Sequence, residues 1–470
     1  MQDSIVVEEN RIYITKQYQE EEDTASMIAR KLYERIPVLT IEKELEEAQK
    51  DLNITLSEQQ KEAVRMVFAN PISIITGGPG TGKTTVLKVI LYIYQKKCGN
   101  KVQLMAPTGR AARRMAESTG SGDATTMHMA LGLFGDGDYE ALIDELSADF
   151  INVDEVSMVD MHLAYEFFYK VKAGARVLLV GDVHQLPSVG AGDVFRQLIL
   201  CGKIPVTVLN LVYRQGKDSN IPINAQLINE GKTNLQWGDD FQMIECSGAD
   251  AAAQIVKNIY LKEIQVYGME QVQILSPYKV RSAAGVLELN RSLQDDVNPP
   301  VSGKQELHLG GEIFREGDRI LQNKNTEVAS NGDLGTLVQI SEDEDNNPIV
   351  QIVFTDGRRV KYEAEQVEMM EHANAITIHK SQGSECQVVI IPWLKAFYPM
   401  LKRNIFYTGI TRAKLRVYIV GEWKAVCQAI HTDDTGTRKT MLAAKIQQYC
   451  ERYQPQSNRQ IPTTICNRAV

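Results

Sequence analysis

The 470-residue sequence lacks the marks of a membrane, secreted or zinc-binding protein. No apolar run approaches the roughly 18 residues that span a membrane, and the amino-terminal stretch lacks the basic and apolar parts of a signal peptide. Seven cysteines are scattered without a Cys-x-x-Cys pair, which is typical of free thiols in a reducing compartment. The net charge of −9 argues against a globally basic nucleic-acid binder, although a local groove can still bind phosphate. We therefore expect a soluble, cytoplasmic protein.

What the sequence has instead is a repeated alternation of short apolar runs with helical stretches. Continuous apolar runs are typical of parallel strands that are buried on both faces of a sheet. There are more of them than one nucleotide-binding sheet needs, so the sequence predicts an α/β fold with two parallel-sheet domains and a boundary near residue 205. The runs occupy residues 72–76, 102–106, 150–154, 176–182, 206–211, 272–277, 388–392 and 417–422.

Two regions depart from this alternation. Residues 1–50 carry apolar residues at helical spacing and predict a helical amino-terminal segment. Residues 308–370 contain short strands separated by Asn-Asn-Pro and Asp-Gly turns, which predicts a β meander or small barrel. Because parallel-strand patterns resume afterwards, this region interrupts the second domain. The predicted first domain covers residues 51–205, and the second covers residues 206–307 and 371–470.

A glycine-rich stretch, GGPGTGKT, occupies residues 77–84 directly after the first apolar run. It fits the pattern G-x-x-x-x-G-K-[ST], in which backbone N–H groups wrap the phosphates of a nucleotide. We expect Lys83 to contact the β- and γ-phosphates of ATP, and Thr84 to coordinate Mg²⁺. The expected nucleotide-binding residues are Gly78, Pro79, Gly80, Thr81, Gly82, Lys83, Thr84 and Thr85.

Further polar residues fit the chemistry of ATP hydrolysis. Asp154 and Glu155 stand at the end of an apolar run, where one carboxylate can hold Mg²⁺ while its neighbour polarises the attacking water. Gln185 follows the next apolar run, and its amide can sense the γ-phosphate. Gln60, upstream of the glycine-rich stretch, is a candidate to read the adenine base, although a glutamine in such a stretch is more often merely exposed.

Several other stretches then follow in a fixed order. Together with GGPGTGKTT, DEVSM and GDVHQLPSVGAG, they closely resemble the motifs of the RecD-like DNA helicases, and the resemblance covers nearly the whole chain. It implies two RecA-like domains and a motor of helicase superfamily 1 that moves 5′ to 3′ on single-stranded DNA. The stretches are APTGRAA (106–112), TTMHMAL (125–131), LVYRQ (211–215), ITIHKSQGSE (376–385) and YTGITRAK (407–414).

The resemblance also implies roles for single residues. Arg214 and Arg412 would reach the γ-phosphate from the second domain, and Glu385 would lie near the ribose. A guanidinium donated across a cleft stabilises transition-state charge only when the domains close, so ATP binding would cause closure and hydrolysis would cause opening. The residues expected to face DNA are Pro107, Thr108, Arg110, Thr126 and His128 in the first domain, and Thr377, His379, Lys380 and Gln382 in the second.

Family comparison also interprets the irregular regions. Residues 132–148 stand where relatives insert a strand-separating pin, and here the stretch is short with an acidic tip, FGDGDY. Residues 308–370 stand where relatives insert a small SH3-like barrel that contacts the DNA strand. The additional amino-terminal domain of larger bacterial relatives is expected to be absent or to have been removed.

We therefore predict a monomeric helicase that uses ATP and Mg²⁺ to step along single-stranded DNA and to open duplex at single-strand/double-strand junctions. One alternative is the motor subunit of a nuclease complex, as RecD itself is; no nuclease metal cluster is apparent, so a nuclease would lie on a partner chain. A Pif1-like helicase is a closer alternative. A scaffold with a vestigial P-loop is disfavoured because Lys83, Glu155, Arg214 and Arg412 are intact.

Overall fold

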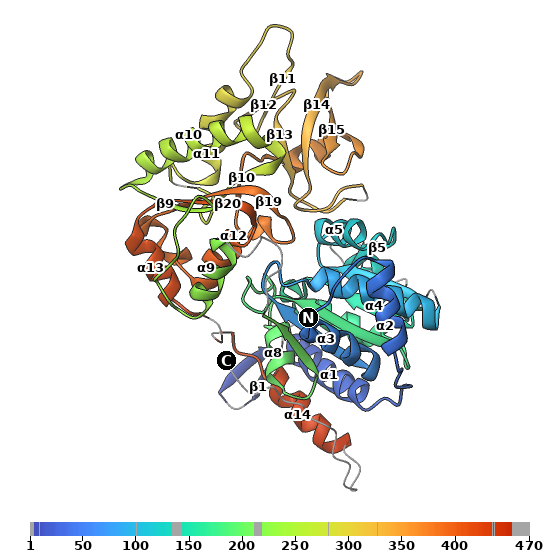
Figure 1. Cartoon of the computed structure of the whole chain (residues 1–470). Coiled ribbons are helices and arrows are strands. Elements are labelled where there is room, and N and C mark those ends of the chain that lie inside the picture. Colours follow the sequence, from blue (N-terminus) through green and yellow to red (C-terminus); the bar gives the residue numbers. More distant parts are fainter. Residues whose placement is uncertain are drawn as a thin grey trace.

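Two α/β units and a small β unit make up the computed structural model of the chain (Figure 1). It describes residues 4–453 except 9, 100, 134–142, 211–218, 281, 327, 435 and 437. Arg214 and the tip of the expected pin therefore lie outside the described residues, and the predictions for them stay predictions. No helix in the described ranges is long and apolar enough to cross a membrane.

The first domain is built on a six-stranded parallel sheet with the order β5-β4-β6-β7-β3-β8. Every residue of β3, β6 and β7 is buried, because helices cover both faces of the sheet and form a separate apolar core on each. The strands are β3 (Ile72–Gly77), β4 (Val102–Ala106), β5 (Ala124–Thr126), β6 (Phe150–Val153), β7 (Arg176–Gly181) and β8 (Val206–Leu209).

Several helices of this domain begin at a side-chain cap that can be read in the sequence. Ser57 and Gln60 form a reciprocal capping box at the start of α3, and Thr108 and Asp160 cap α5 and α7 by accepting from backbone N–H groups. The helices are α3 (Glu58–Ala69), α4 (Lys83–Cys98), α5 (Gly109–Thr119), α6 (Met127–Ala130), η1 (Val156–Met158), α7 (Met161–Lys170) and α8 (Val194–Leu200).

The boundary expected near residue 205 is wrong, because the strand that directly follows it belongs to the first domain. Residues Val206–Leu209 form β8, which pairs in parallel with β3 in the first sheet rather than opening the second. The carboxyl-terminal boundary also needs correction, because α14 (Leu442–Tyr453) packs against α1 and α8 and buries Leu442 and Ile446 in the first-domain core. Apolar spacing identifies a strand or helix but carries no signal for the sheet that it joins.

The amino-terminal segment contains more than the expected helices. It opens with an antiparallel hairpin of β1 (Ile5–Glu8) and β2 (Arg11–Ile14), followed by α1 (Thr15–Leu32) and α2 (Glu42–Asp51). Helix α1 packs against α7 and α14, and α2 packs against α4. The segment therefore forms an outer layer of the first domain.

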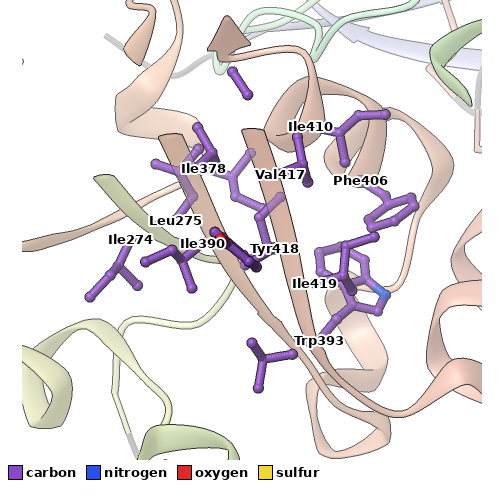
Figure 2. Packing of buried hydrophobic residues seen from close by; sticks show 14 of the residues in the cluster. Ile274, Leu275, Ile378, Ile390, Trp393, Phe406, Ile410, Val417, Tyr418 and Ile419 are labelled. Carbon is purple, nitrogen blue, oxygen red and sulfur yellow. The ribbon is translucent and has the colours of Figure 1, made fainter. Parts of the chain in front are cut away.

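The second domain has a five-stranded parallel sheet with the order β18-β10-β19-β20-β9. Figure 2 shows its core, in which Ile419 lies near Trp393 and Phe406, and Ile390 lies toward Ile274 on the other side of the strands. Its elements are α9 (Asn220–Asn229), β9 (Phe241–Glu245), α10 (Ala249–Tyr267), η2 (Met269–Gln271), β10 (Val272–Ser276), α11 (Val286–Val297), β18 (Ala375–Thr377), η4 (His379–Ser381), β19 (Cys386–Trp393), η5 (Lys395–Met400), α12 (Arg403–Ile410), β20 (Ala413–Gly421) and α13 (Trp423–His431).

The insert in the second domain is antiparallel, as the turn-rich sequence predicts. Five strands in the order β16-β15-β14-β13-β17 enclose their own small apolar core, and a separate hairpin, β11–β12, precedes them. The elements are β11 (Glu306–Leu309), β12 (Glu312–Arg315), β13 (Arg319–Gln322), β14 (Leu334–Glu342), β15 (Pro348–Phe354), β16 (Arg359–Glu363), η3 (Ala364–Met369) and β17 (Met370–His372). In Figure 1 the insert lies above α5 of the first domain.

Candidate functional site

The glycine-rich stretch forms the turn between β3 and the amino terminus of α4. Gly80 and Gly82 adopt φ values of +74° and +85°, a region that side-chain-bearing residues rarely adopt. At Gly82 a Cβ atom would also overlap the Gln60 side chain. The turn thus presents backbone N–H groups at a helix amino terminus, where an anion is stabilised by the helix dipole.

Lys83 is held by its own loop in this conformation. Its Nζ donates to the carbonyl oxygens of Gly77 at 2.5 Å and Gly78 at 3.0 Å. Burial lowers the pKa of Lys83, and the nearby carboxylates of Asp182 and Glu155 oppose that shift. A nucleotide phosphate would give this buried ammonium group a stronger partner than two neutral carbonyls do.

Gln60 lies against this loop and is buried. Its Oε1 accepts from the Ser57 backbone N–H at 3.0 Å, and its Nε2 donates to the Thr81 carbonyl at 3.2 Å. The amide therefore joins the start of α3 to the phosphate-binding turn. Reading of adenine by Gln60 stays a prediction.

The two predicted carboxylates follow β6, beside the loop. Burial, together with the charge of Glu155, raises the pKa of Asp154 to about 6. Asp154 Oδ1 accepts from the Glu155 N–H at 2.8 Å, and Glu155 has a left-handed φ of +53°. Such strained backbone clusters at functional sites. The Asp154 carboxylate, within electrostatic reach of Lys83 in the phosphate-binding turn, has the chemistry to hold Mg²⁺, which takes oxygen ligands and keeps several waters.

Gln185 has one polar atom that is buried without a hydrogen-bond partner. Its Nε2 donates to Asp182 Oδ2 at 3.2 Å, whereas its Oε1 is the unsatisfied atom. An unsatisfied buried oxygen costs free energy unless something donates to it, so this amide fits a sensor that gains a partner when the site fills.

Asp182 is a site residue that the sequence reasoning missed. It directly follows β7, the strand next to β3, is almost fully buried, and accepts from the His184 N–H at 3.1 Å as well as from Gln185. Its position gave a usable signal, because an aspartate at the carboxyl end of a parallel strand beside a phosphate loop faces the ligand crevice.

Residues of α12 and of the neighbouring η4 turn reach this site from the second domain. The Tyr407 hydroxyl donates to Asp182 Oδ2 at 2.8 Å, and it would stand 3.1 Å from a Cβ placed on Gly78. The Leu186 N–H donates to Thr408 Oγ1 at 3.0 Å. Gln382 Nε2 donates to the Leu186 carbonyl at 3.1 Å, so it bridges the domains here; its contact with DNA stays a prediction.

Arg412 is buried in the same cleft. Its Nε donates to the Thr408 carbonyl and its Nη1 to the Ser384 carbonyl, both at 3.2 Å. Burial lowers the pKa of Arg412, and the charge of Glu155 in the first domain opposes this. The structure thus brings an arginine of the second domain within electrostatic reach of the catalytic-base candidate.

Glu385 also links the domains. Its Oε1 accepts from Nη2 of Arg114 on α5 at 2.5 Å, and its Oε2 lies 3.5 Å from Lys414 Nζ on β20. Arg114 is a second residue that the sequence reasoning missed, although it lies close to the APTGRAA stretch. The predicted contact of Glu385 with the ribose stays a prediction.

The residues predicted to face DNA in the first domain lie along one edge of its sheet. Pro107 and Thr108 join β4 to α5, and Thr126 and His128 lie at the start of α6, where Thr126 Oγ1 accepts from the Met129 N–H at 3.2 Å. Burial lowers the pKa of His128. These residues follow the carboxyl ends of two paired strands, β4 and β5, and their contact with DNA stays a prediction.

Arg110 is covered by the insert. It donates to the Gly332 carbonyl, and burial lowers its pKa to about 10. On the next turn of α5, Arg113 pairs with Asp333 and, at 3.1 Å, with Asp356. The turn at residues 330–333 of the insert therefore closes over the amino-terminal half of α5.

The second-domain candidates lie around η4. Lys380 Nζ donates to Asn323 Oδ1 of the insert at 2.6 Å and to Glu371 at 3.2 Å, while the Lys380 N–H donates to Thr377 Oγ1 at 3.3 Å. His379 lines a cavity of about 410 Å³ between the two domains, which Gln185 also lines. No group of three metal-ligating His, Cys, Asp or Glu side chains occurs in the described ranges.

Comparisons with known proteins agree with this arrangement. Three family models match in chain order: an AAA domain at residues 55–249, an SH3 domain of ATP-dependent RecD-like DNA helicases at 289–354, and a UvrD-like helicase C-terminal domain at 372–420. The ATP-dependent RecD2 DNA helicase of Deinococcus radiodurans is 33% identical over 79% of this chain. The RecBCD enzyme subunit RecD of Mycolicibacterium smegmatis is 28% identical over 83%.

The fold and site define a P-loop ATPase of two RecA-like domains with an SH3-like insert in the second. In these three matches and in their order along the chain, it is similar to the RecD-like DNA helicases. It spans half the length of the Deinococcus relative and 76% of the Mycolicibacterium one. A solved structure of a Pif1 helicase aligns with 78% of this chain and with 92% of its own length, at 19% identity and a TM-score of 0.50. At this level of identity, the likeness supports the fold alone.

Proposed function

We propose that this chain is an ATP-dependent helicase that moves 5′ to 3′ on single-stranded DNA and opens the duplex ahead. The observation that carries the proposal is a nucleotide site assembled from two domains. Lys83 and Glu155 belong to the first domain, and Tyr407 and Arg412 reach the same cleft from the second. Chemistry at such a site depends on how the domains are spaced, so hydrolysis can be converted into movement.

ATP binding would begin by drawing Lys83 away from the Gly77 and Gly78 carbonyls and onto the phosphates. Glu155 would orient and polarise the attacking water, and Arg412 would neutralise the charge that develops on the γ-phosphate. Mg²⁺, held by Thr84 and Asp154, would supply further neutralisation of phosphate charge. Loss of the γ-phosphate removes the partner of Arg412 and favours separation of the domains.

The DNA strand would cross the edge of both domains, beneath the insert. Thr108 at the start of α5 and His379 in the interdomain cavity lie along such a path. Because Arg110 bonds to the turn at residues 330–333, a phosphate could reach this guanidinium only after that turn moves. The contacts are to phosphate rather than to base edges, which suits movement on any sequence.

A second candidate function is that of a motor subunit in a nuclease complex. Several relatives of which this chain covers more than two thirds are RecD subunits of RecBCD enzymes, at 70–81% of their length. Such a subunit would hydrolyse ATP in response to DNA but would depend on partner chains for efficient unwinding.

Partial duplexes with a 5′ or a 3′ single-stranded tail test the proposal directly. We expect DNA-stimulated ATP hydrolysis, and unwinding of the 5′-tailed substrate only, by the protein as a monomer. DNA affinity should fall as salt rises, because bound phosphates release counterions. Unwinding of the 3′-tailed substrate alone would refute the polarity, and hydrolysis indifferent to DNA would refute the motor. Strong DNA-stimulated hydrolysis without unwinding would favour the subunit function.

A further inference from the structure

The chain crosses from the second domain back to the first through residues 432–441, which we call the return segment. On its second-domain side, Asp433 pairs with Arg403 at 2.9 Å and Asp434 pairs with Lys402 at 2.7 Å. These pairs tie the beginning of the return segment to the start of α12, the helix that carries Tyr407 into the nucleotide site.

The other end of the return segment is tied to the first domain. Thr440 Oγ1 donates to Glu21 Oε2 at 2.5 Å, and the Met441 N–H donates to Glu21 Oε1 at 3.1 Å. Leu442 and Ile446 of α14 are then fully buried against the first-domain core. Asp434 and Thr440 are six positions apart along the chain, so at most about 20 Å of chain joins the two anchored ends.

The loop that follows Gln185, residues 186–192, is called the sensor loop here. Arg438 lies between the two anchored ends of the return segment and donates hydrogen bonds to this loop. Its Nη1 donates to the carbonyls of Gly190 and Gly192, both at 2.7 Å, and to Ser188 Oγ at 3.3 Å. Its Nη2 donates to the Ser188 carbonyl at 2.6 Å. One guanidinium therefore satisfies three loop carbonyls from a segment about 250 residues away in the sequence.

The sensor loop has few other restraints of its own. It contains no helix or strand, and Gly192 adopts a φ of +93°. The Met161 N–H donates to the Ala191 carbonyl at 2.9 Å, and Gly190 passes too close to Asp160 to accept a Cβ. Ser188 Oγ also donates to the Gly190 carbonyl at 3.3 Å. Three carbonyl oxygens on one side of a loop repel each other without donors between them, so Arg438 supplies a main restraint from outside the loop.

The other end of the sensor loop is joined to the nucleotide site. Leu186 bonds to Thr408 and Gln382 of the second domain, and the adjoining Gln185 bonds to Asp182. The loop also lines the interdomain cavity opposite His379. Arg438 thus links the return segment, through the sensor loop, to the residues around Gln185.

We propose that Arg438 is a positioning residue that couples domain movement to the sensor loop and so sets how strongly DNA stimulates hydrolysis. The inference rests on the proposed motor function. Arg438 does not contact the P-loop or its acidic partners, so its effect must pass through the loop. A simpler role, that of fastening α14 to the first domain, predicts a different set of results.

Arg438→Ala in the full-length chain tests the coupling. Nucleotide affinity should stay within about twofold of wild type, while the DNA-stimulated kcat should fall by about tenfold or more, the usual cost of losing charged hydrogen bonds. Arg438→Lys should recover little of the rate, because a point ammonium cannot reach three carbonyls in the plane of a guanidinium fork. Lys439→Ala, at the exposed neighbouring position, is the matched control and should resemble wild type.

Hydrogen exchange separates coupling from fastening without relying on turnover. In Arg438→Ala the amides of residues 186–192 should exchange faster, whereas those of α14 should keep their protection. Faster exchange throughout α14, with turnover lowered equally with and without DNA, would overturn the proposal in favour of fastening. DNA-stimulated turnover equal to wild type in Arg438→Ala would also overturn it. If wild type itself shows no stimulation by DNA, the motor function fails instead, while the exchange result still reports on the loop.

Discussion

Removing one hydroxyl group tests whether the two domains are held together through the nucleotide site. Tyr407→Phe deletes the donor to Asp182 Oδ2, a bond of 2.8 Å between two side chains that are each only 1% exposed. Burial, with the charge of Asp182, raises the pKa of Tyr407 well above its ordinary value, so the phenol stays protonated and can donate throughout the working pH range. The substitution leaves the apolar ring in place.

The expected effect follows from the surroundings of Asp182. A buried hydrogen bond to a charged group is worth about 1.5–3 kcal/mol. Asp182 keeps its bonds from His184 and Gln185, which places the loss near the lower end of that range. The equilibrium between closed and open domains should therefore shift toward open by roughly tenfold, and DNA-stimulated turnover should fall by about the same factor.

The measurement is DNA-stimulated ATP turnover beside nucleotide affinity in Tyr407→Phe. Turnover should fall more than affinity, because Lys83 and the phosphate-binding turn belong to the first domain alone. Tyr169→Phe is the control, since Tyr169 on α7 is 63% exposed and lies outside the cleft. Wild-type turnover in Tyr407→Phe would show that this bond does not stabilise the conformation that hydrolyses ATP, and the reasoning would fail.

Two further predictions concern the acidic pair. Glu155→Gln should bind ATP yet hydrolyse it slower by about a hundredfold or more, and near-normal single-turnover rates would remove Glu155 as the base. The pKa of Asp154 is raised to about 6, so its stabilising contribution is present below about pH 4 and is lost as pH rises through 6. Without magnesium, Asp154→Asn should match wild type in stability near pH 4 and exceed it by about 2–3 kcal/mol near pH 8. A difference in unfolding free energy between the variant and wild type that is the same at both pH values would contradict this.

Local signals in the sequence were enough for much of the nucleotide site. The glycine pattern places Lys83 at the start of a helix, and apolar runs place Asp154 and Gln185 after buried strands, because each signal involves only neighbouring residues. The antiparallel insert could be recognised for the same reason, since its turns are short and carry their own residues. These predictions of fold class are confirmed, while the roles of single residues stay predictions.

Only the tertiary structure decided which distant segments meet. The strand at Val206–Leu209 is as apolar as its neighbours, yet hydrogen bonding to β3 assigns it to the first sheet. The Tyr407–Asp182 bond joins residues 225 positions apart, and Arg438 meets Ser188 across 250. A tyrosine in a helix or an arginine in a loop carries no periodic pattern, so its partner is fixed only when the two domains dock. The sequence by itself determined the parts of an ATP site, and the docking of the domains determined which side chains complete it.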